Sequence, residues 1–186
     1  FEPKNSKPIL ETEKLGETIK MIQESKRPLF IIGNGVKISK VEKNLEKLFK
    51  KTGIPYAPTW AALDMFRTED PKNIGTFGVY ATRYGNFIVQ NSDLLIVLGS
   101  RLNTSLIGSN AKLFAPNAKK ILVDIDPAEL NEENGLKIDL NQHRYNCHHN
   151  HYRHSRQGCL GCHVQITFSF ADANLLVDCQ KTIVVL

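Results

Sequence analysis

The sequence predicts an α/β fold: a three-layer sandwich with a mostly parallel, Rossmann-like sheet. Residues 29–33 and 93–99 contain continuous apolar runs that stop at glycine. A strand that is apolar along its length is buried on both faces, which is typical of a parallel sheet covered by helices. Segments with helical periodicity alternate with these strands, and right-handed crossovers then place helices on both faces.

The chain before the first strand is expected to hold a linker and one helix. Residues 1–10 contain two prolines and no periodicity, which is typical of a linker. Residues 11–25 carry apolar side chains at helical spacing. The dipeptide Arg27-Pro28 ends this helix and begins the first strand.

A second helix and an edge strand are expected next. Ser39 and Glu42 have the spacing of a capping box, and Gly53 follows as a C-terminal stop. Residues 54–59 are predicted to form a strand whose two prolines favour an edge position. The buried stripe of the helix is expected to comprise Val41, Leu45, Leu48 and Phe49.

The middle of the chain gives weaker patterns. A short helical piece is expected over 61–66, followed by a glycine-containing loop. Residues 84–91 are predicted to form a helix with Phe87 and Ile88 facing inward. A short helix is expected over 111–114.

Two further strands complete the predicted sheet. Residues 120–126 form an apolar run that ends in acidic residues, and 136–140 has the character of a last short strand. The overall alternation of strands and helices is that of an α/β domain.

The composition argues against nucleic-acid binding and against a membrane protein. The net charge of +5 is spread over exposed helix faces, and no basic-aromatic pattern accompanies it, so nucleic-acid binding is not expected. No apolar run is long enough to span a bilayer, and no hydrophobic block follows the polar N-terminus. We therefore expect a cytoplasmic protein without membrane contact. Because the chain lacks an initiator Met, we also expect it to be a fragment.

The glycines after the first strand invite a dinucleotide-binding interpretation. Gly33-Asn34-Gly35 follows an apolar strand, but Ile38 stands where G-x-G-x-x-G needs its third glycine. The second strand also lacks the acid that would bind ribose. Two interpretations remain: one wall of a ligand crevice, or a tight turn without a ligand.

Charged residues follow two other strands. Ser100-Arg101 comes after Gly99, and arginine suits phosphate or carbonyl recognition, although a salt bridge to Asp126 is equally consistent. Asp124 and Asp126 alternate along one strand, so both side chains are expected on one face. They can accept hydrogen bonds from ribose or adenine, or they can cap the next turn.

Residues 1–140 contain no histidine and no cysteine, and they show no nucleophile elbow or phosphate-binding loop of the Walker type. The domain therefore has a predicted ligand crevice but no catalytic set.

Several blocks point to one family. They are Arg27–Val36, Thr52–Pro55, Gly75–Val79, Asn91–Leu102 and Lys120–Pro127. In composition, order and spacing, the run from about Arg27 to Leu140 resembles the central domain of thiamine-diphosphate-dependent enzymes in the acetolactate synthase group.

This resemblance implies a parent enzyme with three α/β domains that acts on 2-oxo acids and forms a homo-oligomer. The missing N-terminal domain would supply a glutamate that activates thiamine diphosphate. The missing C-terminal domain would hold the diphosphate through Mg²⁺ with a GDG…N motif. The central domain of the synthases often binds FAD. By resemblance, the flavin groove would be lined by Gly33, Asn34, Gly35, Thr59, Gly78, Ser100, Arg101, Asp124 and Asp126.

The tail departs from this pattern. All four cysteines and all six histidines follow Leu140. The run Cys159–His163 matches C-x-x-C-H, the attachment pattern of c-type haem, and the other histidines and cysteines could ligate zinc. The third interpretation is a frameshifted or aberrantly joined coding sequence without a selected fold. The expected division is 1–26, linker and leading helix; 27–140, central domain; and 141–186, an irregular His/Cys-rich tail.

Two other functions remain as alternatives. The first is a stand-alone nucleotide-binding module whose His/Cys extension binds metal. The second is an NAD-dependent deacylase, which needs a catalytic histidine beside the nucleotide and a four-cysteine zinc module within the fold. The position of every histidine and cysteine after Leu140 argues against the deacylase.

Overall fold

The computed structural model describes residues 12–130 and 135–143. The expected linker at 1–10 and the C-x-x-C-H run therefore lie outside the described residues. Within them, five parallel strands form one sheet in the order β2-β1-β3-β4-β5. The strands are β1 (Pro28–Ile32), β2 (Tyr56–Pro58), β3 (Leu94–Leu98), β4 (Lys119–Asp124) and β5 (Leu140–His143). The α/β prediction with a parallel sheet is confirmed.

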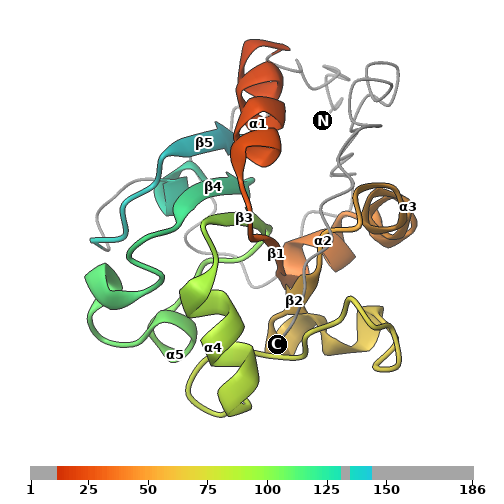
Figure 1. Ribbon diagram of the computed structural model, residues 1–186, viewed down its shortest axis with the longest axis vertical. Coiled ribbons are helices and arrows are strands. Elements are labelled where there is room, and N and C mark those ends of the chain that lie inside the picture. The colour runs from red at the N-terminus through yellow and green to blue at the C-terminus, as the bar shows by residue number, and fades with distance from the viewer. Residues whose placement is uncertain (1–11, 131–134, 144–186) are drawn as a thin grey trace, which may run out of the picture.

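Helices cover both faces of this sheet (Figure 1). The helices α1 (Thr12–Glu24) and α3 (Glu42–Thr52) pack on one face, and α4 (Arg83–Asn91) packs on the other. Shorter elements lie in the connections: α2 (Asn34–Ile38), α5 (Thr104–Ile107), and the 3₁₀ turns η1 (Trp60–Met65), η2 (Ala111–Leu113) and η3 (Pro127–Leu130). Within the described ranges, no helix has the length and apolar character that crossing a bilayer requires.

The central strands are buried on both faces, as their sequences predict. In β1, Phe30 and Ile32 face the α1 and α3 side, whereas Leu29 and Ile31 face the α4 side. All five residues of β1 and of β3 are buried. Each such Leu, Ile or Phe side chain contributes about 1.5–3 kcal/mol by leaving water, so the two apolar runs form the centre of the core.

The start of α3 corrects one prediction. The capping box of Ser39 and Glu42 is wrong, because Ser39 ends α2 and its Oγ donates to the carbonyl of Val36 at 2.8 Å. Lys40 then adopts a positive φ of 55°, which turns the chain into α3. The C-terminal stop is confirmed, since Gly53 has a left-handed φ of 72°. The predicted stripe on α3 is buried.

Helix α4 corrects a second prediction. Phe87 is 68% exposed, so it does not face inward, whereas Val89 is buried. The other predicted inward residue, Ile88, packs against the core as expected. The phase of the helix is set by Gly85, where a Cβ would lie only 2.2 Å from the carbonyl oxygen of Thr76. Val89 follows Gly85 by four residues and therefore shares the buried face, and Phe87 lies on the other side.

The last strand begins later than predicted. The expected strand at 136–140 is wrong in its bounds, because β5 starts at Leu140 and pairs with β4 up to His143. The preceding residues instead form a loop in which the Asp139 carboxylate accepts a hydrogen bond from the Lys120 backbone N–H at 2.9 Å. The helices α2 and α5 have no counterpart in the sequence-based expectation.

Candidate functional site

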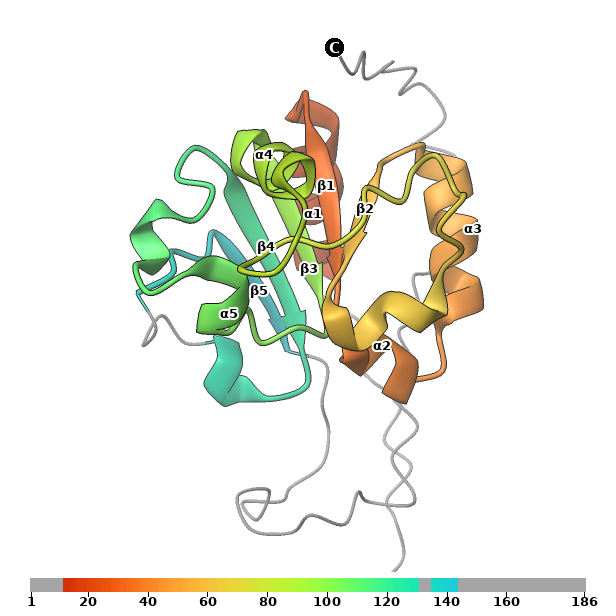
Figure 2. The same ribbon diagram turned by 90° about the horizontal axis from the view of Figure 1, so that it is seen from below.

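The carboxyl ends of the strands lie along one edge of the sheet, at the bottom of Figure 2, together with α2 and η1. The chain leaves β1 to form β2 on one side, and β3 later pairs with the other side of β1. The strand order therefore reverses between β1 and β3. In open α/β sheets, ligands bind at such a switch point.

Three glycines bring the loops after β1 and β3 into backbone contact. The N–H of Gly33 donates to the Leu98 carbonyl at 2.8 Å, and the N–H of Gly35 donates to the Gly99 carbonyl at 3.0 Å. A Cβ on Gly33 would lie 2.1 Å from the Gly99 oxygen, and a Cβ on Gly35 would lie 2.8 Å from the Gly99 Cα. These glycines are needed for close packing, and their amides are already used by protein carbonyls. The structure thus brings Gly33, Gly35 and Ser100 together, with exposed Asn34 beside them.

Thr59 joins this edge from β2. Its N–H donates to the Ile32 carbonyl at 2.8 Å, which places it beside the end of β1. The strand is anchored by Tyr56, whose ring stacks on Phe49 with centroids 4.3 Å apart. The hydroxyl of Tyr56 donates to the Asp70 carboxylate at 2.9 Å, and burial together with this bond raises the pKa of Tyr56. Packing at β2 therefore holds Thr59 in place.

Gly78 lies in the long loop between η1 and α4, which extends to the same carboxyl edge of the sheet. It has a φ of 107°, and a Cβ there would lie 2.6 Å from the carbonyl oxygen of Ser105 in α5, the helix that follows β3. Both its N–H and its carbonyl bond to the Asn86 side chain. Nearby, the Tyr80 ring meets the Trp60 ring with centroids 5.2 Å apart and planes tilted by 40°. This contact joins the loop at Gly78 to the η1 turn that follows Thr59.

The charged residues form a small cluster beyond β3 and β4. Arg101 pairs with Glu129 at 3.4 Å and more loosely with Asp126 at 4.0 Å, so the sequence-based interpretation of an Arg101–Asp126 bridge is confirmed. The side chain of Arg101 remains 72% exposed. Burial raises the pKa of Glu129, although the Arg101 guanidinium opposes that shift.

The two aspartates make local capping bonds. Asp124 Oδ1 accepts from the N–H of Ile125 at 2.7 Å and from the N–H of Asp126 at 3.0 Å. Asp126 Oδ1 accepts from the N–H of Ala128 at 3.0 Å. Since β4 ends at Asp124, Asp126 belongs to the following turn rather than to the same strand face. One oxygen of each carboxylate shapes the loop, and no hydrogen bond to the other Asp124 oxygen is found among the described residues.

Two aromatic residues of the candidate site were not predicted from the sequence. Trp60 is 38% exposed and Tyr80 is 83% exposed, so both rings offer a face to a ligand. Trp60 and Tyr80 are 20 residues apart in the sequence. The signal that could have identified them is the presence of aromatic residues in segments without helical or strand periodicity. Together the edge offers aromatic faces, an exposed guanidinium and carboxylate oxygens. Among residues 12–130 and 135–143, no group of three or more His, Cys, Asp or Glu could hold a metal ion.

Comparison with known proteins gives a consistent match. Residues 15–142 match the family model for the central domain of thiamine pyrophosphate enzymes. Over 129 residues, 69% of this chain, the sequence is 36% identical to acetolactate synthase 1, chloroplastic, of Zea mays. It is 38% identical over 127 residues, 68% of this chain, to the acetolactate synthase isozyme 1 large subunit of Escherichia coli. These alignments cover 20% and 22% of the two relatives, so the chain spans about a fifth of their length.

Proposed function

The chain belongs to the family of thiamine pyrophosphate enzyme central domains, and from this premise we propose that it holds a nucleotide, FAD by preference, within a longer enzyme of the acetolactate synthase group. The observation that carries the proposal is the rim at the switch point, where Trp60, Tyr80 and Arg101 lie exposed beside closely packed glycine loops.

The residues at this edge fit a flavin nucleotide in their chemistry. Exposed aromatic rings such as Trp60 and Tyr80 stack on flat heterocycles, which is a frequent way of holding bases. Arg101 can pair with phosphate oxygens through its planar fork of N–H donors. Oδ2 of Asp124, for which the described residues provide no hydrogen bond, is suited to accept from ribose hydroxyls, while Oδ1 keeps the loop in shape. Backbone hydrogen bonds between the loops after β1 and β3 fix the loop from which Arg101 extends.

The carbon chemistry of the whole enzyme belongs elsewhere in our proposal. Thiamine diphosphate, held with Mg²⁺ by other domains, would supply the electron sink for reactions of 2-oxo acids such as pyruvate. The described residues of this chain contribute no metal cluster to that reaction. Their part is to orient the nucleotide and to present a surface to the neighbouring domains.

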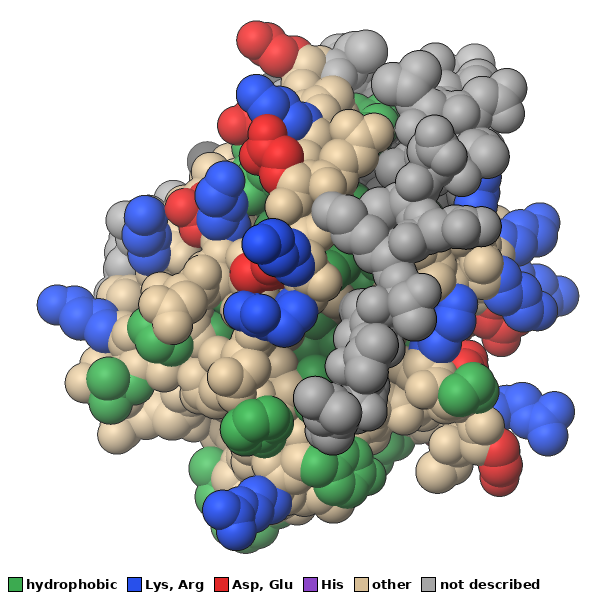
Figure 3. All heavy atoms as spheres, in the orientation of Figure 1, with side chains coloured by type: hydrophobic (Ala, Val, Ile, Leu, Met, Phe, Trp, Pro, Cys, Tyr) green, Lys and Arg blue, Asp and Glu red, His purple; other side chains and the backbone are tan. Residues whose placement is uncertain are grey.

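A surface for those neighbours is visible on α4 and on the loop that precedes it. Val79, Tyr80, Tyr84 and Phe87 are exposed to 65%, 83%, 57% and 68%. Figure 3 shows hydrophobic side chains gathered over α4 and the adjoining loops, whereas lysines cover α3. Contiguous apolar surface of this kind marks interaction sites. It supports contact with the other domains of a longer protein and with a second subunit.

The nucleotide proposal is tested by loading the 186-residue chain with FAD, desalting it and measuring the retained flavin absorbance. We expect retention by the wild type and about tenfold weaker binding by Tyr80→Ala, because loss of one stacking ring costs about 1–3 kcal/mol. Phe87→Ala, which removes another exposed aromatic side chain, on α4, is the control and should bind as the wild type does. Failure of the wild type to retain FAD, or equal losses in both variants, would refute the proposal.

A further inference from the structure

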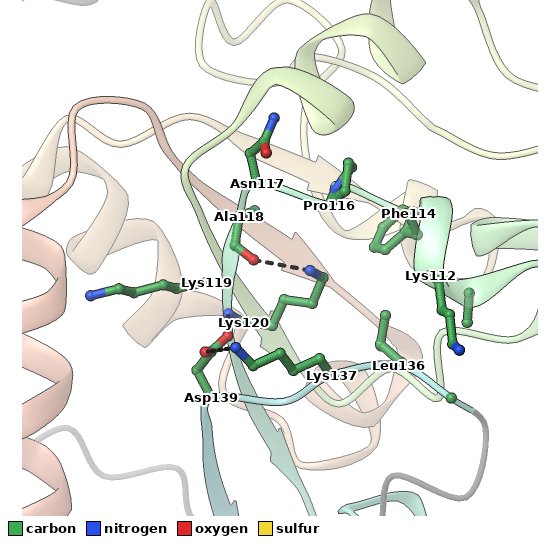
Figure 4. A pocket seen from close by; sticks show the side chains of 12 residues that line it. Lys112, Phe114, Pro116, Asn117, Ala118, Lys119, Lys120, Leu136, Lys137 and Asp139 are labelled. Carbon is green, nitrogen blue, oxygen red and sulfur yellow. Dashed lines mark hydrogen bonds and ion pairs between the residues drawn. The ribbon is translucent and has the colours of Figure 1, made fainter.

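A cavity of about 300 Å³ lies at the opposite edge of the sheet, where β4 begins (Figure 4). Its walls come from two segments, 111–120 before and within β4 and 135–139 before β5. Lys120 stands at its inner end, four residues before Asp124 on the same strand. At about 3.3 Å per strand residue, the two residues are roughly 13 Å apart. The cavity is therefore separate from the nucleotide rim.

Lys120 is buried to an extent that is rare for lysine. The residue is only 5% exposed, and its side chain extends into the apolar layer on the α4 side of the sheet. Its Nζ donates to the carbonyls of Ala115 and Ala118, both at 2.9 Å. These bonds hold the turn in which Ala115 takes a φ of 41°. An ammonium has three donors, so two of them are used by this turn.

The charge of Lys120 has no carboxylate partner in the part of the chain that the structure describes. The nearby Asp139 accepts from the Lys120 backbone N–H through Oδ2 and pairs with Lys137 through Oδ1 at 3.5 Å. Burial lowers the pKa of Lys120, and the charge of Asp139 offsets this shift only in part, which reflects the cost of keeping this cation out of water. A buried charge of this kind is normally paired, so an anion that entered the cavity would relieve the cost.

The lining favours an anion with an apolar body. Besides Lys119, three lysines and one aspartate contribute to the walls, and this excess of lysine gives the cavity a net positive charge. Phe114 and Leu136 are buried and supply apolar surface beside Lys120. Lys119 points away from the cavity in Figure 4, as expected for the neighbouring residue of a strand.

We propose that this cavity binds a small organic carboxylate, with its carboxylate group at Lys120 and its apolar body between Phe114 and Leu136. A single remaining N–H donor matches one carboxylate oxygen better than a doubly charged phosphate, which needs several donors. A volume of about 300 Å³ suits a molecule of one ring or a short branched chain.

The test is a titration of the 186-residue chain with benzoate, followed by amide chemical shifts and calorimetry. We expect shifts confined to residues 111–120 and 135–139, and no binding of benzamide, the neutral analogue of similar shape. Lys120→Met should weaken benzoate binding at least tenfold. Lys47→Met, which removes an exposed lysine from α3, should leave the affinity unchanged within twofold.

A second variant covers the case in which Lys120→Met fails to fold. Lys137 is 81% exposed, so Lys137→Glu should keep the fold while it reverses the charge at the mouth of the cavity. We expect benzoate affinity to fall at least threefold at low ionic strength, where charge effects are least screened. Equal binding of benzamide and benzoate, equal binding of inorganic phosphate, unchanged affinity in either cavity variant, or shifts at the opposite edge would overturn the proposal.

Discussion

The two edges of the sheet differ in the burial of a charged side chain: Arg101 is exposed at one edge and Lys120 is buried at the other. At the carboxyl edge, the charges of Arg101 and Asp126 stay exposed, and the tight packing beneath them is made by backbone through Gly33 and Gly99. At the amino edge, the charge of Lys120 is buried, and its side chain fills the space beneath a turn. At the carboxyl edge the exposed charged groups can exchange their present partners for a ligand. At the amino edge the ammonium of Lys120 is held in the interior.

This difference predicts at which residues a substitution should change the free energy of unfolding. Exposed ion pairs contribute little to stability because water already solvates them, while close backbone packing tolerates no added atom. The carboxyl edge should therefore be sensitive at its glycines and tolerant at its charges. The amino edge should respond to changes in the protonation of Lys120.

The largest effect is expected from Gly33→Ala. Its Cβ would lie 2.1 Å from the Gly99 oxygen, so the loops after β1 and β3 must separate and their two hydrogen bonds weaken. We expect a loss of about 3 kcal/mol or more in the free energy of unfolding, measured with urea. The same change at Gly16 is the control, because nothing lies within 4 Å there and the residue is exposed inside α1. Gly16→Ala should stabilise by about 0.5–1 kcal/mol. Equal changes in the free energy of unfolding at the two positions would show that close backbone packing at Gly33 is not needed.

A smaller effect concerns the pH dependence at the amino edge. Because burial lowers the pKa of Lys120, the unfolded chain binds more protons than the folded one between that lowered pKa and the ordinary 10.5. The free energy of unfolding should therefore rise with pH through this window. The difference between the wild type and Lys120→Met, measured by urea unfolding at several pH values, should show this rise. A difference that stays flat, or that falls with pH, would mean that the ammonium is compensated.

The smallest effect is expected at the exposed charges. Arg101→Ala should change the free energy of unfolding by no more than about 0.5 kcal/mol, since Arg101 is 72% exposed and water screens its pairs with Glu129 at 3.4 Å and Asp126 at 4.0 Å. Yet the variant should retain less FAD than the wild type if the guanidinium contacts phosphate. Thermal unfolding and flavin retention measured on one preparation separate these two roles. A large loss of stability would show that the Arg101 cluster holds the fold together.

Much of the fold could be predicted because the informative signals are local. Continuous apolar runs identify β1 and β3, and the glycine at 53 identifies the end of α3. On α4 the inward position of Ile88 was predicted, but Phe87 was misplaced because Gly85, which sets the phase of the helix, carries no hydrophobic side chain. The capping box failed because a single left-handed residue, Lys40, inserts a turn between two helices.

The candidate site was harder to predict than the fold because it depends on contacts between distant segments. The strand ends were recognisable one by one, and the Arg101–Asp126 bridge was one of two interpretations of Arg101. The Trp60–Tyr80 contact depends on the path of the long loop between β2 and α4, which carries no periodic signal. Lys120 gave no warning either, since a lysine at the start of a strand is ordinarily exposed.

We propose that the switch-point edge, and not the lysine-lined edge, holds the nucleotide. The most direct measurement is the map of amide chemical shifts of the 186-residue chain during titration with FAD. Our account expects changes at residues 33–35, 59–60, 78–80 and 100–101, with 111–120 unaffected. Changes confined to 111–120 and 135–139, or no saturable change at all, would contradict it.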